Sequence, residues 1–283
     1  MAEGNIVFIA PDGITEVSLN DGVNVHARSV SGVGMAQPLN QAEVVPLEDG
    51  ERYVRTLLAP RFIAFDLVIT DTSWSALHAR RRALITALNP RRGIGTLRWT
   101  PVSGGAVYAI AAILERGFTL AESSTPGPLI INDAVSFRCP DPGWRSNVLV
   151  TTNLTPAAGG MAVPTDVPTE LVDGGGTVVI ANAGDLDSYP VVTFTGPCVG
   201  PSIENETTGK VCSFPLLILA SGETLTIDMA ARTAKIGGLS VLSKRRSGDE
   251  FWALVPGNNT IVAGTTSGSS TVQVKYYPRY AGV

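Results

Sequence analysis

The sequence predicts a mainly β protein with one helix, in which an N-terminal α+β domain precedes a C-terminal antiparallel β-sandwich. Short runs rich in β-branched and aromatic residues recur along the chain, separated by Gly, Pro, Asn and Asp turns. A helical spacing of apolar residues is convincing at one place. The composition then shifts to Thr, Pro, Gly and Ala. These patterns predict an N-terminal domain over 1–146, a linker over 147–176 and a C-terminal domain over 177–283.

Length and composition support two globular domains. A chain of 283 residues suits two domains of about 150 residues each. Hydrophobic residues make up 44% of it and charged residues 16%, against about 25% in typical soluble domains. The longest apolar run, 106–114, is too short to span a bilayer, and the first residues lack a secretory signal pattern. We therefore expect a soluble protein made in a cytosol.

The charge argues against a general affinity for nucleic acid or anionic membranes, because the formal net charge is −4. Residues 1–150 nevertheless carry 13 Arg and no Lys. The use of Arg without Lys is typical of a surface that makes bidentate or stacked contacts, because the planar guanidinium suits both. A GC-rich genome that writes Arg codons explains the bias equally well.

Cysteine and histidine are too few for a metal centre. Three cysteines without a CxxC spacing and two histidines, His26 and His78, provide no plausible zinc ligand set. Cys198 and Cys212 could face each other across a turn. In a protein assembled in a cytosol, buried thiols are the favoured interpretation.

The N-terminal domain reads as strands, one helix and further strands. Strands are predicted at 5–10, 14–19, 23–30, 52–58 and 61–70, a hairpin at 93–102 and 106–120, and a last strand within 128–146. Residues 31–50 read as irregular. Within 61–70, Ile63, Phe65, Leu67 and Ile69 alternate with the other residues, so one face of that strand is wholly apolar and should be buried.

The helix is predicted at about 73–89. Asp71, Thr72 and Ser73 supply N-cap candidates, and Asn89-Pro90 ends it. The residues at helical spacing are Trp74, Leu77, Arg81, Leu84, Ile85 and Leu88. The candidate subunit or partner interface consists of the polar face and the residues after the helix, namely His78, Arg80, Arg82, Arg91 and Arg92. A solvated face is the alternative.

The C-terminal domain shows short strands about every ten residues and no convincing helix. The predicted strands are 177–182, 190–196, 211–219, 223–229, 232–238, 251–257, 260–264 and 270–277. This spacing favours an antiparallel sandwich or a jelly-roll-like domain. Its alternating apolar runs predict burial of Phe194, Leu217, Ile227, Trp252 and Leu254.

Motifs for catalysis are absent from the sequence. It contains no HExxH, GxSxG, P-loop or dinucleotide-binding GxGxxG in context. Acidic pairs such as Asp185/Asp187 and Glu204/Glu206 lie in turn-like segments, where acids are common. The sequence therefore predicts neither an enzyme nor a cofactor, and offers no candidate catalytic, cofactor-binding or metal-ligating residue.

Several segments resemble the siphophage distal tail proteins. Residues 60–99, PRFIAFDLVITDTSWSALHARRRALITALNPRRGIGTLRW, are similar to the family's N-terminal signature, and FRCPDPGWRS (137–146) is similar to the close of that domain. In the second half, ANAGDLDSYPVVTFTGPCVGPSIENETTG (181–209), LASGETLTIDMAARTAKIGG (219–238) and FWALVPGNNTI (251–261) resemble the family's blocks in the same order. Residues 1–49 and the linker match less well.

The resemblance implies a structural virion protein without catalytic residues. Distal tail proteins form a homohexameric ring that joins the tail tube to the tail-tip or baseplate hub. DNA passes through the lumen without specific binding. The implied partners are other copies of the chain, the tail tube protein and the tail-tip hub protein, with the tape measure protein and a host-surface glycan as further candidates. The implied location is the virion tail tip, assembled in the host cytoplasm with no membrane, and the C-terminal domain would be galectin-like.

Two other classes of protein remain open at this point. A carbohydrate-binding module of a phage tail or a glycosidase accessory protein would show exposed aromatics and a concave Asn/Arg/Glu cluster on one sheet face. A tail-tube protein would need hairpins and a long loop from a single domain, and the second domain argues against it.

Overall fold

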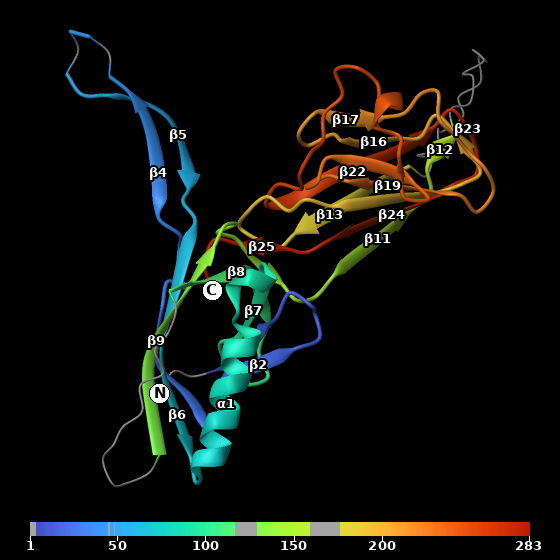
Figure 1. Ribbon diagram of the computed structural model, residues 1–283. Helices are drawn as coiled ribbons and strands as arrows, with labels where there is room; N and C mark the ends of the chain where they lie inside the picture. Colours follow the sequence, from blue (N-terminus) through green and yellow to red (C-terminus); the bar gives the residue numbers. More distant parts are fainter. Residues whose placement is uncertain (1–3, 45, 48, 117–128, 159–175) are drawn as a thin grey trace, which may run out of the picture. The chain divides into compact units, whose positions relative to one another are not determined.

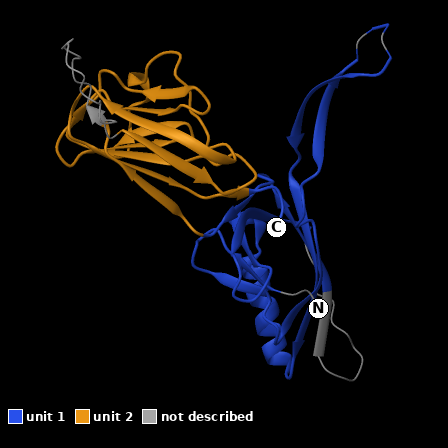
Figure 2. Ribbon diagram, turned by 180° about the vertical axis from the view of Figure 1, so that it is seen from behind, with its two compact units in different colours: residues 1–147, 280–283 blue, residues 148–279 orange. Residues whose placement is uncertain are grey.

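The chain divides into two compact units. The computed structural model describes residues 4–44, 46–47, 49–116, 129–158 and 176–283. The first unit comprises Met1–Asn147 together with Tyr280–Val283, and the second comprises Val148–Arg279 (Figure 2). The last four residues therefore belong to the first unit, whereas the sequence predicts them in the C-terminal domain.

The main sheet of the first unit is antiparallel, with the strand order β2-β1-β7-β8-β9-β6-β3 (Figure 1). Its strands are β1 (Asn5–Ile9), β2 (Glu16–Asn20), β3 (Val25–Ser31), β6 (Arg61–Asp71), β7 (Gly95–Thr100), β8 (Tyr108–Arg116) and β9 (Leu129–Cys139). A short strand, β10 (Trp144–Ser146), pairs with β8. The order places β6 and β9, distant in the sequence, side by side over eleven residue pairs from Arg61↔Cys139 to Asp71↔Leu129.

The predicted alternation of β6 is confirmed, and the helix packs on its apolar face. Ile63, Phe65, Leu67 and Ile69 are each at most 2% exposed and belong to the core of the first unit. The helix α1 (Trp74–Ala87) begins at the N-cap Ser73, whose Oγ accepts a hydrogen bond from the Ala76 N–H at 3.2 Å. A serine N-cap stabilises a helix in this way, because it gives a hydrogen-bond acceptor to an N–H group of the first turn that has none within the helix.

The apolar stripe of the helix is narrower than the spacing suggests. Leu77, Leu84 and Leu88 are buried, but Trp74 and Ile85 are 46% and 47% exposed. Both lie at the edge of the stripe, beyond the reach of the strands that the helix covers. The 3₁₀ turn η1 (Pro90–Arg92) follows, with Asn89 as its cap, so the helix ends where Asn89-Pro90 predicts.

Residues 31–50 are not irregular throughout, as the sequence suggests. They contain β4 (Pro38–Glu43), which pairs with β5 (Arg52–Leu58) in a separate two-stranded sheet. PLNQAE carries no β-branched residue and no apolar alternation, so its sequence gives no strand signal. Pairing with the predicted strand 52–58 is what makes it a strand.

The second unit is built from three sheets around one core, without an α-helix in its described residues. One sheet has the order β11-β24-β14-β19-β20-β21, a second has β12-β22-β16-β17 with β13 also paired to β22, and a third has β18-β15-β23. The longer strands are β11 (Val150–Leu154), β13 (Thr177–Asn182), β14 (Val191–Thr195), β16 (Ser202–Asn205), β17 (Lys210–Ser213), β19 (Thr224–Asp228), β20 (Thr233–Ile236), β22 (Gly257–Thr265) and β24 (Thr271–Tyr276). The short elements are β12 (Ala157–Ala158), β15 (Cys198–Val199), β18 (Ile218–Leu219), β21 (Leu239–Ser240), η2 (Leu242–Lys244) and β23 (Ser267–Gly268). A last short strand, β25 (Arg279–Tyr280), pairs with β10 in the main sheet of the first unit.

Two sequence expectations for the second unit need correction. Of the predicted strand 251–257, residues 251–256 form no strand apart from an isolated bridge between Leu254 and Ser188, and Gly257 begins β22. Side-chain amides satisfy the backbone of this segment instead: Asn205 Nδ2 donates to the Ala253 carbonyl at 3.0 Å, and the Val255 N–H donates to Asn259 Oδ1 at 2.9 Å. The predicted strand 211–219 is interrupted at 214–217, between β17 and β18. In the predicted linker, whose composition leaves room for one short strand, residues 150–154 form β11, which pairs with β24. Residues 159–175, the rest of that linker, lie outside the described part of the chain.

The buried residues bear out the predicted cores. Phe194, Leu217, Ile227, Trp252 and Leu254 are at most 2% exposed. Cys139, Cys198 and Cys212 are free, buried thiols. Burial raises the pKa of the Cys139 and Cys212 thiols to about 12. The overall prediction of a mainly β protein with one α-helix is confirmed for the described residues.

Truncating Trp252 tests the second core. Trp252 is 2% exposed, so Trp252→Ala removes a full indole from a packed interior. We expect a loss of about 3–5 kcal/mol in the free energy of unfolding, measured by chemical denaturation. Leu216→Ala, at a side chain that is 86% exposed, is the matched control and should change stability by less than about 0.5 kcal/mol. Equal effects of the two substitutions would contradict the core assignment.

Candidate assembly surface

One face of the first unit's sheet is largely exposed. Most of its residues are small or polar, but Phe62 of β6, opposite Arg138, is an aromatic side chain that is 52% exposed. The core side of β3, β6, β9 and β8 packs on the helix and on β1 and β7. On the opposite side, the strand pairing brings side chains into rows across the sheet. One row is Ser31, Ala64, Ser136 and Arg116, and the next is Ser29, Asp66 and Ala134. We call this surface the uncovered sheet face.

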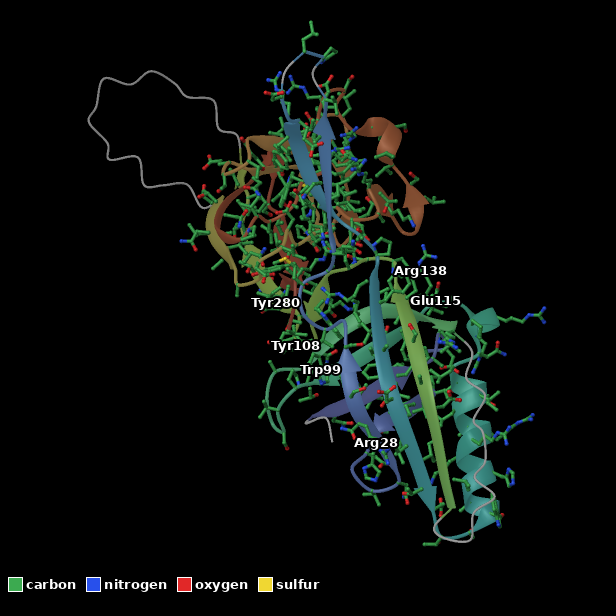
Figure 3. All side chains as sticks on the ribbon, turned by 90° about the vertical axis from the view of Figure 1, so that its left-hand side faces the viewer. Arg28, Trp99, Tyr108, Glu115, Arg138 and Tyr280 are labelled. Carbon is green, nitrogen blue, oxygen red and sulfur yellow. The ribbon has the colours of Figure 1, made fainter. Side chains whose placement is uncertain are left out.

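Charges of both signs lie on the strands of the uncovered sheet face. Arg28, Arg138 and Glu115 project from β3, β9 and β8, where they are labelled in Figure 3, and all three are exposed. Asp66 is also exposed and accepts a hydrogen bond from the Ser29 hydroxyl. Acidic and basic groups therefore both occur on the described part of this surface.

A second distinctive surface is the hairpin of β4 and β5, which projects from the sheet of the first unit (Figure 1). Its two strands pair with each other alone. Leu39 faces Leu57 across the hairpin, and Gln41 faces Arg55, whose Nε donates to Gln41 Oε1 at 2.6 Å. Tyr53, Thr56 and Asn40 form a chain of hydrogen bonds of 3.0 and 2.7 Å. The hairpin is thus ordered by its own contacts.

Arg61 holds the base of the hairpin. Arg61 is 2% exposed, and its guanidinium forms no ion pair with a carboxylate of the described residues but donates to backbone carbonyls. Nε binds the Pro142 carbonyl at 2.9 Å, and Nη1 binds the carbonyl of Gly32 at 2.8 Å and that of Gly34. Burial lowers the pKa of this group from its ordinary value, but an arginine stays charged.

The last residues of the chain complete this arrangement. Arg61 Nη2 donates to the carbonyl of Ala281, and the Val283 N–H donates to the Val33 carbonyl at 3.3 Å. Gly282 lies against the backbone of Gly34, where a Cβ would come within 2.8 Å of the Gly34 carbonyl carbon. The ring of Tyr280 stacks edge-on to Tyr108 with centroids 5.4 Å apart, and Figure 3 labels both. The C-terminus therefore fixes the strand connection from which the hairpin starts.

The structure places the predicted interface residues in two different environments. Arg80 and Arg92 form ion pairs of 2.8 Å with Asp71 and Asp12. The Arg80 hydrogen bond lowers the pKa of Asp71, and hydrogen bonds from Thr15, together with the Arg92 charge, lower that of Asp12. These two arginines hold the helix and η1 to the end of β6 and to the turn between β1 and β2, all within the first unit.

The other predicted interface residues remain exposed. His78, Arg82 and Arg91 lie on the outer side of the helix and on η1. The His78 ring lies 6.0 Å from that of Trp74. Arg82 and Arg91 form no ion pair with the described part of the chain. Their role as an interface stays a prediction.

Sequence reasoning missed Arg61 and the first strand of the hairpin. A lone Arg at the start of a buried strand carries no signal of burial, because charged residues are rarely buried. The one available clue was the position of Arg61 after Pro60, at the head of the most apolar strand. For β4 the sequence offers no clue.

The second unit has a shallow hollow over β11, β24 and β14. Its volume is about 440 Å³, and it is lined by Asn153, Leu154, Thr155, Thr193, Thr195, Thr271, Val272 and Gln273. None of these residues is aromatic, so no ring is available there for stacking on a sugar. Trp252, the most obvious stacking candidate, is buried. The features named for a carbohydrate-binding module are therefore not found in this hollow.

Other chemistry is not evident among the described residues. They contain no cluster of three or more His, Cys, Asp or Glu side chains placed to hold a metal ion. No helix within the described ranges is long and apolar enough to cross a membrane.

The comparisons with known proteins identify the class of protein. Residues 183–280 match the family described as siphovirus-type tail component, C-terminal domain. They comprise most of the second unit and the first of the four C-terminal residues that belong to the first unit. No curated protein matches the sequence. The chain thus carries a domain of a siphophage tail component.

Solved structures extend the likeness to the whole chain. The crystal structure of the Dit protein (gp 19.1) of phage SPP1 is similar with a TM-score of 0.68 and 15% identity, covering 96% of this chain and 98% of that one. It is described as a paradigm of the hub adsorption apparatus in phages that infect Gram-positive bacteria. A chain of the phage P2 baseplate, in its activated conformation with Ca, is similar with a TM-score of 0.51 and 10% identity, covering 97% and 98% of the two chains. Both comparisons support the resemblance to siphophage distal tail proteins: the chain shares the fold of the SPP1 Dit protein, and its residues 183–280 match a siphophage tail-component domain.

Replacing Arg61 tests the anchoring of the C-terminus. Arg61→Leu leaves four backbone carbonyls without their donor, and we expect a loss of about 3 kcal/mol or more in the stability of the first unit. Hydrogen exchange at 32–34 and 280–283 should rise at the same time. Arg138→Leu, at an exposed arginine of the neighbouring strand, is the control. Unchanged exchange in Arg61→Leu would show that the anchor depends on other contacts.

Proposed function

We propose that this chain is a distal tail protein that closes into a homohexameric ring between the tail tube and the tail-tip or baseplate hub. The proposal rests on the fold shared with a hub protein and on the tail-component domain at 183–280. Repeating one head-to-tail interface closes a ring when the rotation between copies closes. The first unit supplies the ring, and the second unit lies outside it and meets neighbouring tip proteins.

The uncovered sheet face is the observation that carries this proposal. This four-stranded surface consists mainly of Ser, Ala and charged residues of both signs, together with the aromatic Phe62, and so needs little cover from its own chain. Placed on the inside of the ring, it borders the channel for DNA. A basic wall would hold DNA through released counterions, whereas a wall with charges of both signs lets it pass without specific binding.

The partners follow from this position. They are other copies of the chain, the tail tube protein on one side and the tail-tip hub protein on the other, with the tape measure protein and a host-surface glycan as further candidates. The protein acts as a structural part of the virion tail tip, assembled in the host cytoplasm, and works without a cofactor or an active site.

Mass measurement tests the ring. The purified full chain of 29.6 kDa should appear in native mass spectrometry at six times that mass, and as rings with a central hole in electron micrographs. A chain that stays monomeric at the highest attainable concentration and is absent from any ring in tail particles would overturn the proposal. Rings held together by the second unit alone would reverse the assignment of the two units.

Adding positive charge tests the channel wall. Ser136→Lys places one ammonium group per copy on the uncovered sheet face beside Ala64. We expect virions that assemble normally but release DNA more slowly, because each added cation retains phosphate. Thr224→Lys, at an exposed position of the second unit, is the control. Normal release in Ser136→Lys virions would place this face away from the DNA.

A further inference from the structure

We propose that one edge of the second unit, residues 229–248, docks an acidic segment of another tail protein that also carries apolar side chains. We call this surface the basic edge. It runs from the end of β19 through β20, β21 and η2 to Gly248. The inference rests on the proposed contact between the second unit and neighbouring tip proteins, and it names the surface and the chemistry of the partner.

Positive charge in the second unit is concentrated at the basic edge. Residues 148–279 carry eight Lys or Arg and eleven Asp or Glu. None of the acids falls within 229–248, whereas five of the eight cations do, namely Arg232, Lys235, Lys244, Arg245 and Arg246. A patch of one sign attracts groups of the opposite sign, so this edge of an otherwise acidic unit favours an acidic partner.

Most of these cations are available to a partner. Arg245 is used within the chain, because its guanidinium donates to the Asp249 carbonyl and lies 5.2 Å from the centre of the Phe251 ring. The other four are exposed and form no ion pair with the described part of the chain: Arg232, Lys235, Lys244 and Arg246.

The acids that flank the basic edge are bound to other groups. Asp228 and Glu223 each accept a hydrogen bond from a nearby backbone N–H, at 2.8 and 2.9 Å. Asp249 accepts hydrogen bonds from the N–H and the hydroxyl of Ser213. Glu250 forms an ion pair of 2.8 Å with a lysine of β17. Within the described residues, none of these carboxylates forms an ion pair with the four exposed cations.

The backbone holds the basic edge in place before a partner arrives. β20 pairs with both β19 and β21, and the Val241 N–H donates to the Ala234 carbonyl at 2.9 Å. Beyond η2, the Arg246 N–H donates to the Ser213 carbonyl of β17 at 3.0 Å. The segment thus runs from the edge of one sheet to the edge strand of another. A surface that is already ordered loses little conformational entropy on binding.

Apolar side chains among the cations favour a protein partner over a simple polyanion. Leu239 and Leu242 are 77% and 38% exposed. β21 is the last strand of its sheet, and its outer edge pairs with no further strand of the described residues. Interfaces bury apolar groups among charged ones, and a free strand edge can pair with an extended segment of another chain. An extended segment with acidic and apolar side chains matches all three features.

A defined peptide tests this chemistry on the full chain. The probe is a fluorescent peptide in which Glu alternates with Leu and Thr, and fluorescence anisotropy measures its binding. We expect an affinity that falls with added salt, and binding at least about tenfold weaker when Gln replaces Glu in the peptide. Replacing Leu by Ser in the peptide should weaken binding about fivefold or more, because apolar contact area is lost.

Variants of the chain locate the binding. Lys244→Glu with Arg246→Glu should weaken peptide binding at least about tenfold, and Leu239→Ser with Leu242→Ser about fivefold or more. The matched charge control is Lys275→Glu on β24, outside the basic edge, and the matched apolar control is Leu216→Ser with Ile218→Ser. Both controls should leave the Kd within about twofold, because screening limits the reach of a distant charge. Thermal unfolding checks that each variant folds.

Two results would overturn the inference at this stage. One is binding that survives the change of Glu to Gln in the peptide or the pair Lys244→Glu and Arg246→Glu in the chain. The other is polyphosphate that binds as tightly as the peptide while the leucine substitutions change nothing, because the edge would then be a general surface for anions.

Tail particles separate this inference from the ring. Tails that carry Lys244→Glu with Arg246→Glu should contain normal rings but lack a neighbouring tip protein, as mass spectrometry of purified tails would show. Tails of normal composition would overturn the inference and leave the ring intact. A full chain that binds the peptide but never forms rings would overturn the proposed ring and leave the basic edge as a docking surface.

Discussion

The buried guanidinium of Arg61 is the interaction on which the arrangement of the first unit depends. It gathers the carbonyls of Pro142, Gly32, Gly34 and Ala281, which come from three separate parts of the chain. A buried charge is costly unless its donors are satisfied, so these carbonyls must stay in place for the unit to be stable. As a result the second unit is attached to the first through both of its ends, at 147–148 and at 279–280. The same clamp fixes the root of the projecting hairpin.

The surfaces of the first unit are those of a protein made for assembly. Its sheet buries one face in a continuous core and leaves the other lined by Ser, Ala and mixed charges. Within the described part of the chain, its outermost strands β2 and β3 and its hairpin have edges that pair with no further strand. A monomeric protein usually protects such edges, whereas a closed ring can use them.

The second unit depends on buried asparagines. Asn182 Nδ2 donates to the carbonyls of Leu254 and Leu186, at 2.9 and 3.1 Å, and Asn205 and Asn259 bind the backbone of 253–257. All three asparagines are at most 2% exposed. Each amide satisfies backbone groups that no strand pairs, which allows an irregular segment carrying Trp252 to enter the core. These asparagines fall within the segments that resemble the family, so that part of the resemblance records a packing requirement.

The sequence by itself determined what depends on neighbours along the chain. Alternation in 61–70 gave the buried face of β6, Ser73 and Asn89-Pro90 gave the ends of the helix, and the apolar runs gave the residues of both cores. Tertiary structure alone decided the remainder. Whether Arg80 and Arg92 face solvent or pair with Asp71 and Asp12 depends on which strands lie beside the helix. That PLNQAE is a strand, that 251–256 is not, and that the last four residues return to the first unit follow from partners distant in sequence, because backbone groups bind whatever donor or acceptor the fold brings to them.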